Sequence, residues 1–137
     1  MGRNIGAGLA GVIIAVLSVW LVQKIGHAVY PPAEGLDLQD LGAMKAYVEA
    51  LPIGALLFVI ASYFVGTVVG TCAACAIGTM LPRVFAMLVA CVMLVATGVN
   101  VAMIPHPVWF IALAVIAIVV GAWLGTKCKR ATTGNTE

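Results

Sequence analysis

Two closely spaced cysteines are the first candidates for chemistry in this 137-residue sequence. In Cys72-Ala73-Ala74-Cys75 the thiols are three residues apart, which places both on one face of a helix. Thiolate ligands select soft ions such as Cu(I) or Hg(II). The alternative is that both cysteines are small apolar residues buried between helices. We predict no resident metal or cofactor, and keep Cys72 and Cys75 as the candidate ligands if a metal is bound.

The pair is similar to the paired cysteines of bacterial mercuric-ion membrane carriers. It departs from that family because it lies in the second predicted membrane span, and because Ala76-Ile77 follow where a proline is expected. Cys91 and Cys128 fall toward the same end of the predicted helices. We assign that end to the cytoplasm, which keeps thiols reduced, so we predict no structural disulfide.

Other polar groups offer little for catalysis. His27 and His106 are expected at the outer interface, where they are polar surface residues or, with few other ligands nearby, a poor metal site. Asn100, with Thr97, is expected to form a hydrogen bond between helices. The sequence shows no Ser/His/Asp grouping and no glycine-rich phosphate loop, so we predict no enzymatic activity.

The composition excludes an ordinary soluble domain. Charged residues make up 9% of the chain and hydrophobic residues 64%, whereas soluble domains carry about 25% charged residues. About 20 helical residues cross a bilayer, and the long uncharged intervals hold four such spans. The +2 net charge is too small to suggest nucleic-acid binding. We predict spans at about 5–22, 53–80, 84–104 and 108–126.

The absence of Asp, Glu, Lys and Arg inside these spans also limits function. Proton-coupled antiport needs an intramembrane carboxylate, so that mechanism is disfavoured. Basic residues set the orientation: five fall at one set of span ends and two at the other, which places both termini in the cytoplasm. Segment 23–52 then forms an outer loop and 127–137 a cytoplasmic tail. The expected location is a bacterial inner membrane.

The outer loop is the most individual segment. Leu41, Met44, Val48 and Leu51 recur at helical spacing, with Leu38 before them, and predict an amphipathic helix from about Asp37 to Leu51. Either Asp37 or Asp40 can cap its N-terminus. The helix is expected to lie along the membrane surface, either as a lid over its own bundle or as a docking surface. The candidate binding residues of this loop are Tyr30, Pro31, Pro32, Glu34, Asp37 and Asp40.

The segment Tyr30-Pro31-Pro32-Ala33-Glu34-Gly35-Leu36-Asp37 resembles small bacterial four-span inner-membrane proteins with a Y-P-P-x-x-G-x-D motif in their outer loop. The resemblance covers most of the chain, but its motif is short. It implies the same fold and a bacterial plasma membrane, and it carries over no activity.

Small residues at four-residue spacing predict how the helices pack. Such stripes let helix backbones approach closely, either within one chain or between copies. An offset of 55 residues also aligns Gly66 with Gly121 and Gly70 with Gly125, which suggests two tandem helical hairpins. The packing candidates are Ser62, Gly66, Gly70, Ala74 and Gly78 in the second span, and Gly121 and Gly125 in the fourth.

Together these features predict an all-α membrane protein, a four-helix bundle with a short amphipathic helix outside. The leading functional hypothesis is a non-enzymatic accessory or scaffold protein that associates through its small-residue faces and its acidic loop. The alternative is a small transporter or permeation protein for a neutral or lipidic solute, followed by thiol-based metal handling. The expected partners are the lipid bilayer and either a second copy or another membrane protein.

Overall fold

The described residues form five helices. The computed structural model describes residues 2–31, 34–35, 37, 39–79 and 81–128, so Pro32, Leu38, Met80 and the tail from 129 lie outside the described residues. The prediction of an all-α four-helix bundle with an additional short helix is confirmed. The helices are α1 (Gly2–Val29), α2 (Leu41–Ala50), α3 (Ile53–Ile77), α4 (Pro82–Met103) and α5 (Val108–Gly125).

Four of these helices can cross a membrane. α1, α3, α4 and α5 have 28, 25, 22 and 18 residues, and even the shortest spans about 27 Å at 1.5 Å per residue. Large apolar side chains such as Ile13, Leu17 and Val119 are more than half exposed, as expected for a surface that faces lipid. The chain is therefore an integral membrane protein.

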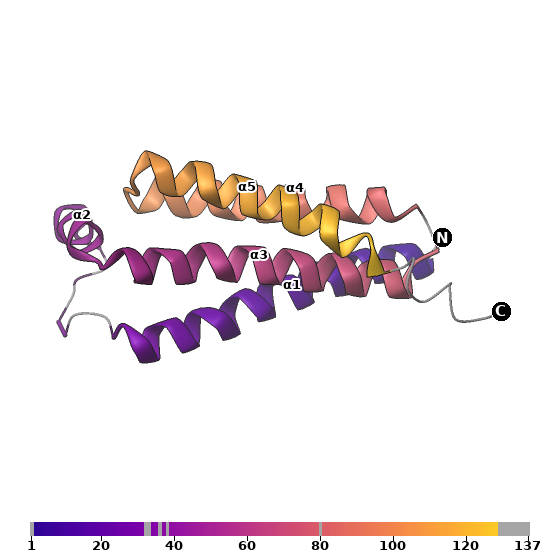
Figure 1. The fold of residues 1–137 in the computed structure, drawn as a ribbon, viewed down its shortest axis with the longest axis horizontal. Coiled ribbons are helices and arrows are strands. Elements are labelled where there is room, and N and C mark those ends of the chain that lie inside the picture. Colours follow the sequence, from indigo (N-terminus) through magenta and orange to yellow (C-terminus); the bar gives the residue numbers. More distant parts are fainter. Residues whose placement is uncertain (1, 32–33, 36, 38, 80, 129–137) are drawn as a thin grey trace.

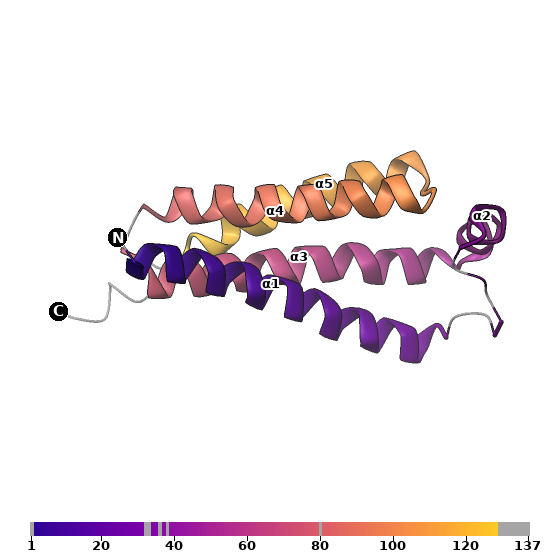
Figure 2. The ribbon, with the colours of Figure 1, turned by 180° about the vertical axis from the view of Figure 1, so that it is seen from behind.

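α3 is the central helix of the bundle. It packs most extensively against α1 and α5, and also contacts α4. Figures 1 and 2 show α3 between α1 on one side and the α4–α5 pair on the other, with α1 running obliquely to it. The short helix α2 lies crosswise at the end where α3 begins (Figure 1). The two longest interfaces therefore both belong to α3.

The α1–α3 interface is built on small residues. A Cβ atom added at Gly70 would lie 2.5 Å from the carbonyl oxygen of Gly11 and 2.6 Å from the Cβ of Ala15. One added at Gly66 would lie 2.8 Å from the carbonyl oxygen of Ala15. Ala74 completes this stripe and is fully buried. Only residues without a larger side chain allow the two backbones to approach so closely.

The α5 glycines pack against the other side of α3. A Cβ atom added at Gly121 would lie 3.0 Å from the carbonyl oxygen of Phe64, and one at Gly125 would lie 2.8 Å from that of Val68. Gly66 and Gly70 of α3 thus face α1, the other helix of the first hairpin. Gly121 and Gly125 of α5 face α3, which belongs to the first hairpin and not to their own. The glycines aligned by the sequence repeat do not occupy equivalent places in the packing.

A compact core fills the middle of the bundle. Phe110, Ile118 and Val89 are fully buried there, and Met93 and Tyr63 are nearly so. These side chains come from α3, α4 and α5, so the core ties the α4–α5 hairpin to the central helix.

Candidate functional site

A hollow lies at the end of the bundle that carries α2. Its volume is about 480 Å³, within the range of small-molecule sites. Side chains from α1, α2, α3, the end of α4 and the α4–α5 loop line it. Apolar groups predominate, and the polar ones are Gln23, His27, Tyr30, Tyr47, Asn100 and His106.

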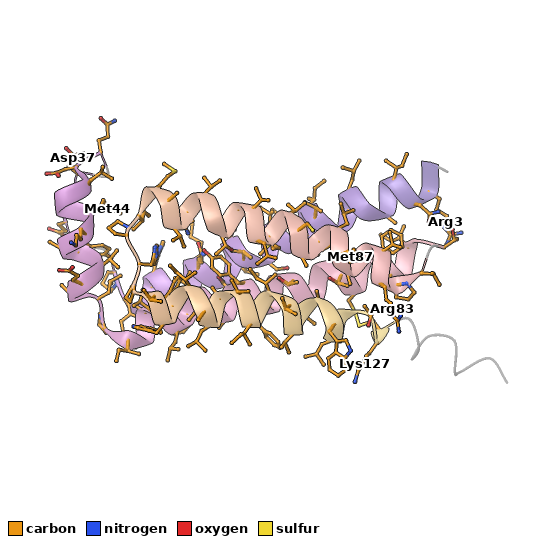
Figure 3. All side chains as sticks on the ribbon, turned by 90° about the horizontal axis from the view of Figure 1, so that it is seen from above. Arg3, Asp37, Met44, Arg83, Met87 and Lys127 are labelled. Atoms are coloured by element: carbon orange, nitrogen blue, oxygen red, sulfur yellow. A yellow bond between two sulfur atoms is a disulfide. The ribbon has the colours of Figure 1, made fainter. Side chains whose placement is uncertain are left out.

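α2 forms one wall of this hollow. Met44 and Val48, one helical turn apart, are both buried and line the hollow, while Lys45 and Glu49 on the other face are exposed. Figure 3 shows Met44 on the crosswise helix, with Asp37 at the beginning of the same segment. Of the predicted apolar edge, Met44, Val48 and Leu51 line the hollow beneath α2, whereas Leu41 is 66% exposed and does not. The helix that forms this lid over the hollow runs from Leu41 to Ala50, so its predicted start at Asp37 was a turn too early.

The lid begins at a defined cap. The carboxylate of Asp40 accepts hydrogen bonds from the backbone N–H groups of Gly42 at 2.8 Å and Ala43 at 3.2 Å. Asp37 instead accepts a bond from the N–H of Gln39 at 2.9 Å in the preceding turn. Of the two predicted caps, Asp40 is the one that begins the helix.

Two polar pairs connect the hollow to the helices beneath it. The amide of Gln23 donates to the hydroxyl of Ser62 at 3.3 Å, which joins α1 to α3. The amide of Asn100 donates to the hydroxyl of Tyr63 at 2.9 Å, which joins α4 to α3. Gln23 and Asn100 also line the hollow, so each carboxamide oxygen is a possible acceptor for a ligand hydroxyl.

Aromatic rings shape the rest of the rim. Tyr30 meets Phe58 edge to face, with ring centroids 6.1 Å apart. His106 stacks on Phe110 with centroids 4.5 Å apart, and its Nδ1 atom lies 2.7 Å from the carbonyl oxygen of Ile104. These contacts hold His106 in place at the mouth. A neutral imidazole would donate from Nδ1 and present Nε2 as an acceptor.

The predicted outer-loop binding residues divide into two groups. Tyr30 lines the hollow. Pro31, Glu34, Asp37 and Asp40 are exposed and do not line it. Pro32 lies outside the described residues. The acidic residues therefore form the outward surface near the lid, separate from the hollow itself.

The chemistry of the hollow suits an uncharged ligand. No Asp, Glu, Lys or Arg from the described part of the chain lines it. Burying a charge without a partner is costly, so this lining favours an uncharged ligand over a charged one. The described residues also contain no group of three or more His, Cys, Asp or Glu side chains that could hold a metal ion.

The cysteines differ from expectation. The structure joins Cys72 to Cys128 in a disulfide, with Cα atoms 5.5 Å apart, so the prediction of no structural disulfide was wrong. The end of α5 packs beside the end of α3, which brings together two residues 56 positions apart in sequence. Cys75 is buried against Ala74 and Phe85. Since Cys72 is bonded to sulfur, it is unavailable as a thiolate in this state.

A second hollow lies at the opposite end between α4 and α5, and the two have no lining residue in common. The buried core of Tyr63, Val89, Met93, Phe110 and Ile118 lies between them. The described residues therefore line a hollow at each end of the bundle, with buried side chains between the two.

Sequence reasoning missed Gln23 and Tyr63. Gln23 was assigned to the outer loop because the first predicted span ended at residue 22, whereas α1 continues to Val29. Tyr63 was hidden within an apolar span. A usable signal was present, since Gln23, Tyr63 and Asn100 are polar groups of three different helices, each in the half nearer to α2.

Comparison of the chain with protein-family models, with curated proteins and with solved structures gave no match.

Proposed function

We propose that this protein is a non-enzymatic membrane protein that binds a small, uncharged, amphipathic molecule in the hollow beneath α2. The observation that carries the proposal is the hollow itself: about 480 Å³, apolar walls, and a few polar groups from separate helices. An alcohol or amide head group would meet Gln23 and Asn100, and its hydrocarbon part would contact Met44 and Val48.

This proposal develops the permeation hypothesis, but as binding of a solute beneath α2 and not as an open channel through the bundle. A solute from the outer leaflet or the aqueous side reaches the hollow when α2 lifts, because α2 makes few contacts with the other helices. Passage further would need the core around Tyr63 and Phe110 to open. Binding beneath the lid is therefore the step that the geometry supports.

Hydrogen–deuterium exchange of the α2 amides tests the proposal. A ligand that binds only the closed lid slows exchange by mass action, about tenfold at a concentration ten times its dissociation constant. We expect 1-hexanol to slow α2 exchange in the purified protein. Ala55 lines the hollow and Ala61 of the same helix is exposed, so Ala55→Phe should abolish the effect and Ala61→Phe should retain it. Equal slowing in both variants would refute the proposal, because it would reflect the detergent and not the hollow.

A second candidate function rests on the acidic outer surface. Glu34, Asp37 and Glu49 are exposed around the lid and fit an accessory protein that docks a basic partner. The small-residue faces offer less for such a role, since α1 and α5 of the same chain occupy them. Native mass spectrometry of gently extracted protein tests this candidate. A bound protein should be lost when the three acids become amides and kept when exposed Gln39 becomes Ala. A bare monomer before any substitution would refute it.

We propose that the basic end faces the cytoplasm of a bacterial inner membrane. Arg3, Arg83 and Lys127 support this orientation through the positive-inside rule. The Cys72–Cys128 bond lies at that end and would meet a reducing environment. We therefore expect both thiols to be alkylated in acid-quenched cells and protected in protein isolated in air. A disulfide that is intact in quenched cells would contradict this orientation.

A further inference from the structure

The second hollow, at the end opposite α2, has a different character from the first. It is about 810 Å³ and lies between the beginning of α4 and the end of α5. Figure 3 shows Arg83 and Lys127 at this end, with Met87 further along the bundle. Both cationic side chains line the hollow together with Thr126. The other lining residues are apolar or aromatic, such as Met87, Val119 and Trp123.

The order of these groups follows the depth of a bilayer. Arg83 and Lys127 lie at the helix ends, where the head groups of a membrane would be. Ala90 and Val119 lie about two turns deeper, or about 10 Å at 1.5 Å per residue. The hollow is therefore cationic at its mouth and apolar in its deeper part. This arrangement is complementary to an anionic lipid, which has a negatively charged head group and apolar acyl chains.

The hollow is open toward the membrane. Met87 is 68% exposed, and Val119 and Trp123 are also more than half exposed. In a membrane-spanning bundle these side chains face lipid and not water. An acyl chain could therefore enter the groove sideways from the surrounding leaflet without any rearrangement of the helices.

Among the residues that the structure describes, Arg83 and Lys127 have no acidic partner. The described acidic residues all belong to segment 34–49 at the opposite end of the bundle, and the described ion pair, Lys45 with Glu49, lies there too. The ammonium of Lys127 lies over the ring of Trp123, 3.9 Å from its centroid, which holds it at the edge of the groove. No side chain caps the first turn of α4 beside Arg83. Each of these features favours an anion at this mouth.

We propose that the α4–α5 groove is a binding site for an anionic phospholipid, with the lipid phosphate between Arg83 and Lys127 and an acyl chain along Ala90 and Val119. Basic pockets between helices bind anionic head groups in this way. The charge complementarity selects a lipid with a net negative head group, such as phosphatidylglycerol, over a zwitterionic one. The site is independent of the ligand proposed for the hollow beneath α2.

Trp123 provides a local probe of this groove. Trp20→Phe and Trp109→Phe leave it as the only tryptophan in the chain. The protein is then reconstituted in phosphatidylcholine vesicles that contain brominated phosphatidylglycerol or, at equal mole fraction, brominated phosphatidylcholine. Bromine quenches tryptophan on contact, so the two quenching curves give the relative association of the two lipids with the groove.

The expected preference for phosphatidylglycerol follows from the two cations. Each basic residue near an anionic surface contributes about a fivefold preference, so two give up to about 25-fold. Arg83→Gln with Lys127→Gln should bring the preference close to one, and Lys127→Gln alone should lower it about fivefold. Unchanged quenching by phosphatidylcholine shows that these variants remain folded and inserted.

The matched control removes two cations from the other end. Lys24→Gln with Lys45→Gln changes the net charge by the same amount and should leave the preference intact. Equal quenching by both lipids in the parent protein would overturn the proposal, as would little quenching by either, which would show that protein covers the groove. An equal loss of preference in the control would also overturn it, because general surface attraction would then explain the effect.

Discussion

Replacing Gly70 with alanine tests the packing of the central helix most sharply. The added Cβ atom would lie 2.5 Å from a backbone oxygen of α1, whereas an ordinary contact begins at 3.4 Å. The interface must therefore open by about 0.9 Å, and a backbone atom cannot rotate away as the end of a side chain can. Overpacking of this kind costs about 1–3 kcal/mol.

Part of this cost is offset within the helix. Alanine is better than glycine in a helix interior by about 0.5–1 kcal/mol. The net expectation for Gly70→Ala is a loss of about 0–2.5 kcal/mol in the free energy of unfolding, centred near 1 kcal/mol. Gly98 in α4 provides the matched control, since a Cβ atom added there meets nothing within 4 Å. Gly98→Ala keeps the helical gain without the clash.

The assay is titration of the purified protein in neutral detergent with sodium dodecyl sulfate, followed by tryptophan fluorescence. We expect Gly70→Ala to unfold at a lower dodecyl sulfate fraction than the parent, and Gly98→Ala to unfold at the same fraction or a higher one. If Gly70→Ala is as stable as the parent, or if both variants lose stability equally, the close α1–α3 contact does not hold the bundle together.

Two further predictions concern the hollow and its lid. Asn100→Leu removes the donor to the Tyr63 hydroxyl and should lower stability by about 0.6–1.7 kcal/mol in the same titration, and adding Tyr63→Phe should cost little more because the bond is already lost. A full second loss would show that the two side chains act separately. Asp40→Ala removes the cap of α2, worth about 1 kcal/mol, and should speed hydrogen exchange of the α2 amides about fivefold. Asp40→Asn can still cap the helix and should keep the exchange rate of the parent protein. Unchanged exchange in the alanine variant would show that the cap does not hold the lid.

Much of the fold could be predicted because the membrane imposes simple rules. Uncharged stretches long enough to span a bilayer become helices, since every backbone polar group must be satisfied internally. The stripe through Gly66 and Gly70 predicted a close helix contact, and the structure places α1 against it. The pattern alone left open whether this contact lay within the chain or between copies, because a second copy could present the same small residues.

The site was harder to predict because it depends on which helix ends meet. Nothing in the sequence states that Asn100 bonds to Tyr63, or that Cys72 lies beside Cys128, until α3 is known to be the central helix. The prediction of no disulfide considered the redox compartment alone and did not foresee that Cys72 and Cys128 lie within bonding distance. The lid was partly visible, since Met44 and Val48 already formed an apolar edge.

The most direct test of the central claim is to map where an uncharged amphipathic probe binds. Octanol that carries a photoactivatable diazirine labels neighbouring side chains on illumination, and mass spectrometry locates them. We predict saturable labelling at Tyr30 and Tyr47, competed by excess octanol, abolished by Ala55→Phe and retained in Ala61→Phe. Labelling that rises linearly with probe and spreads along the lipid-facing side chains, with no saturable component beneath α2, would contradict the account.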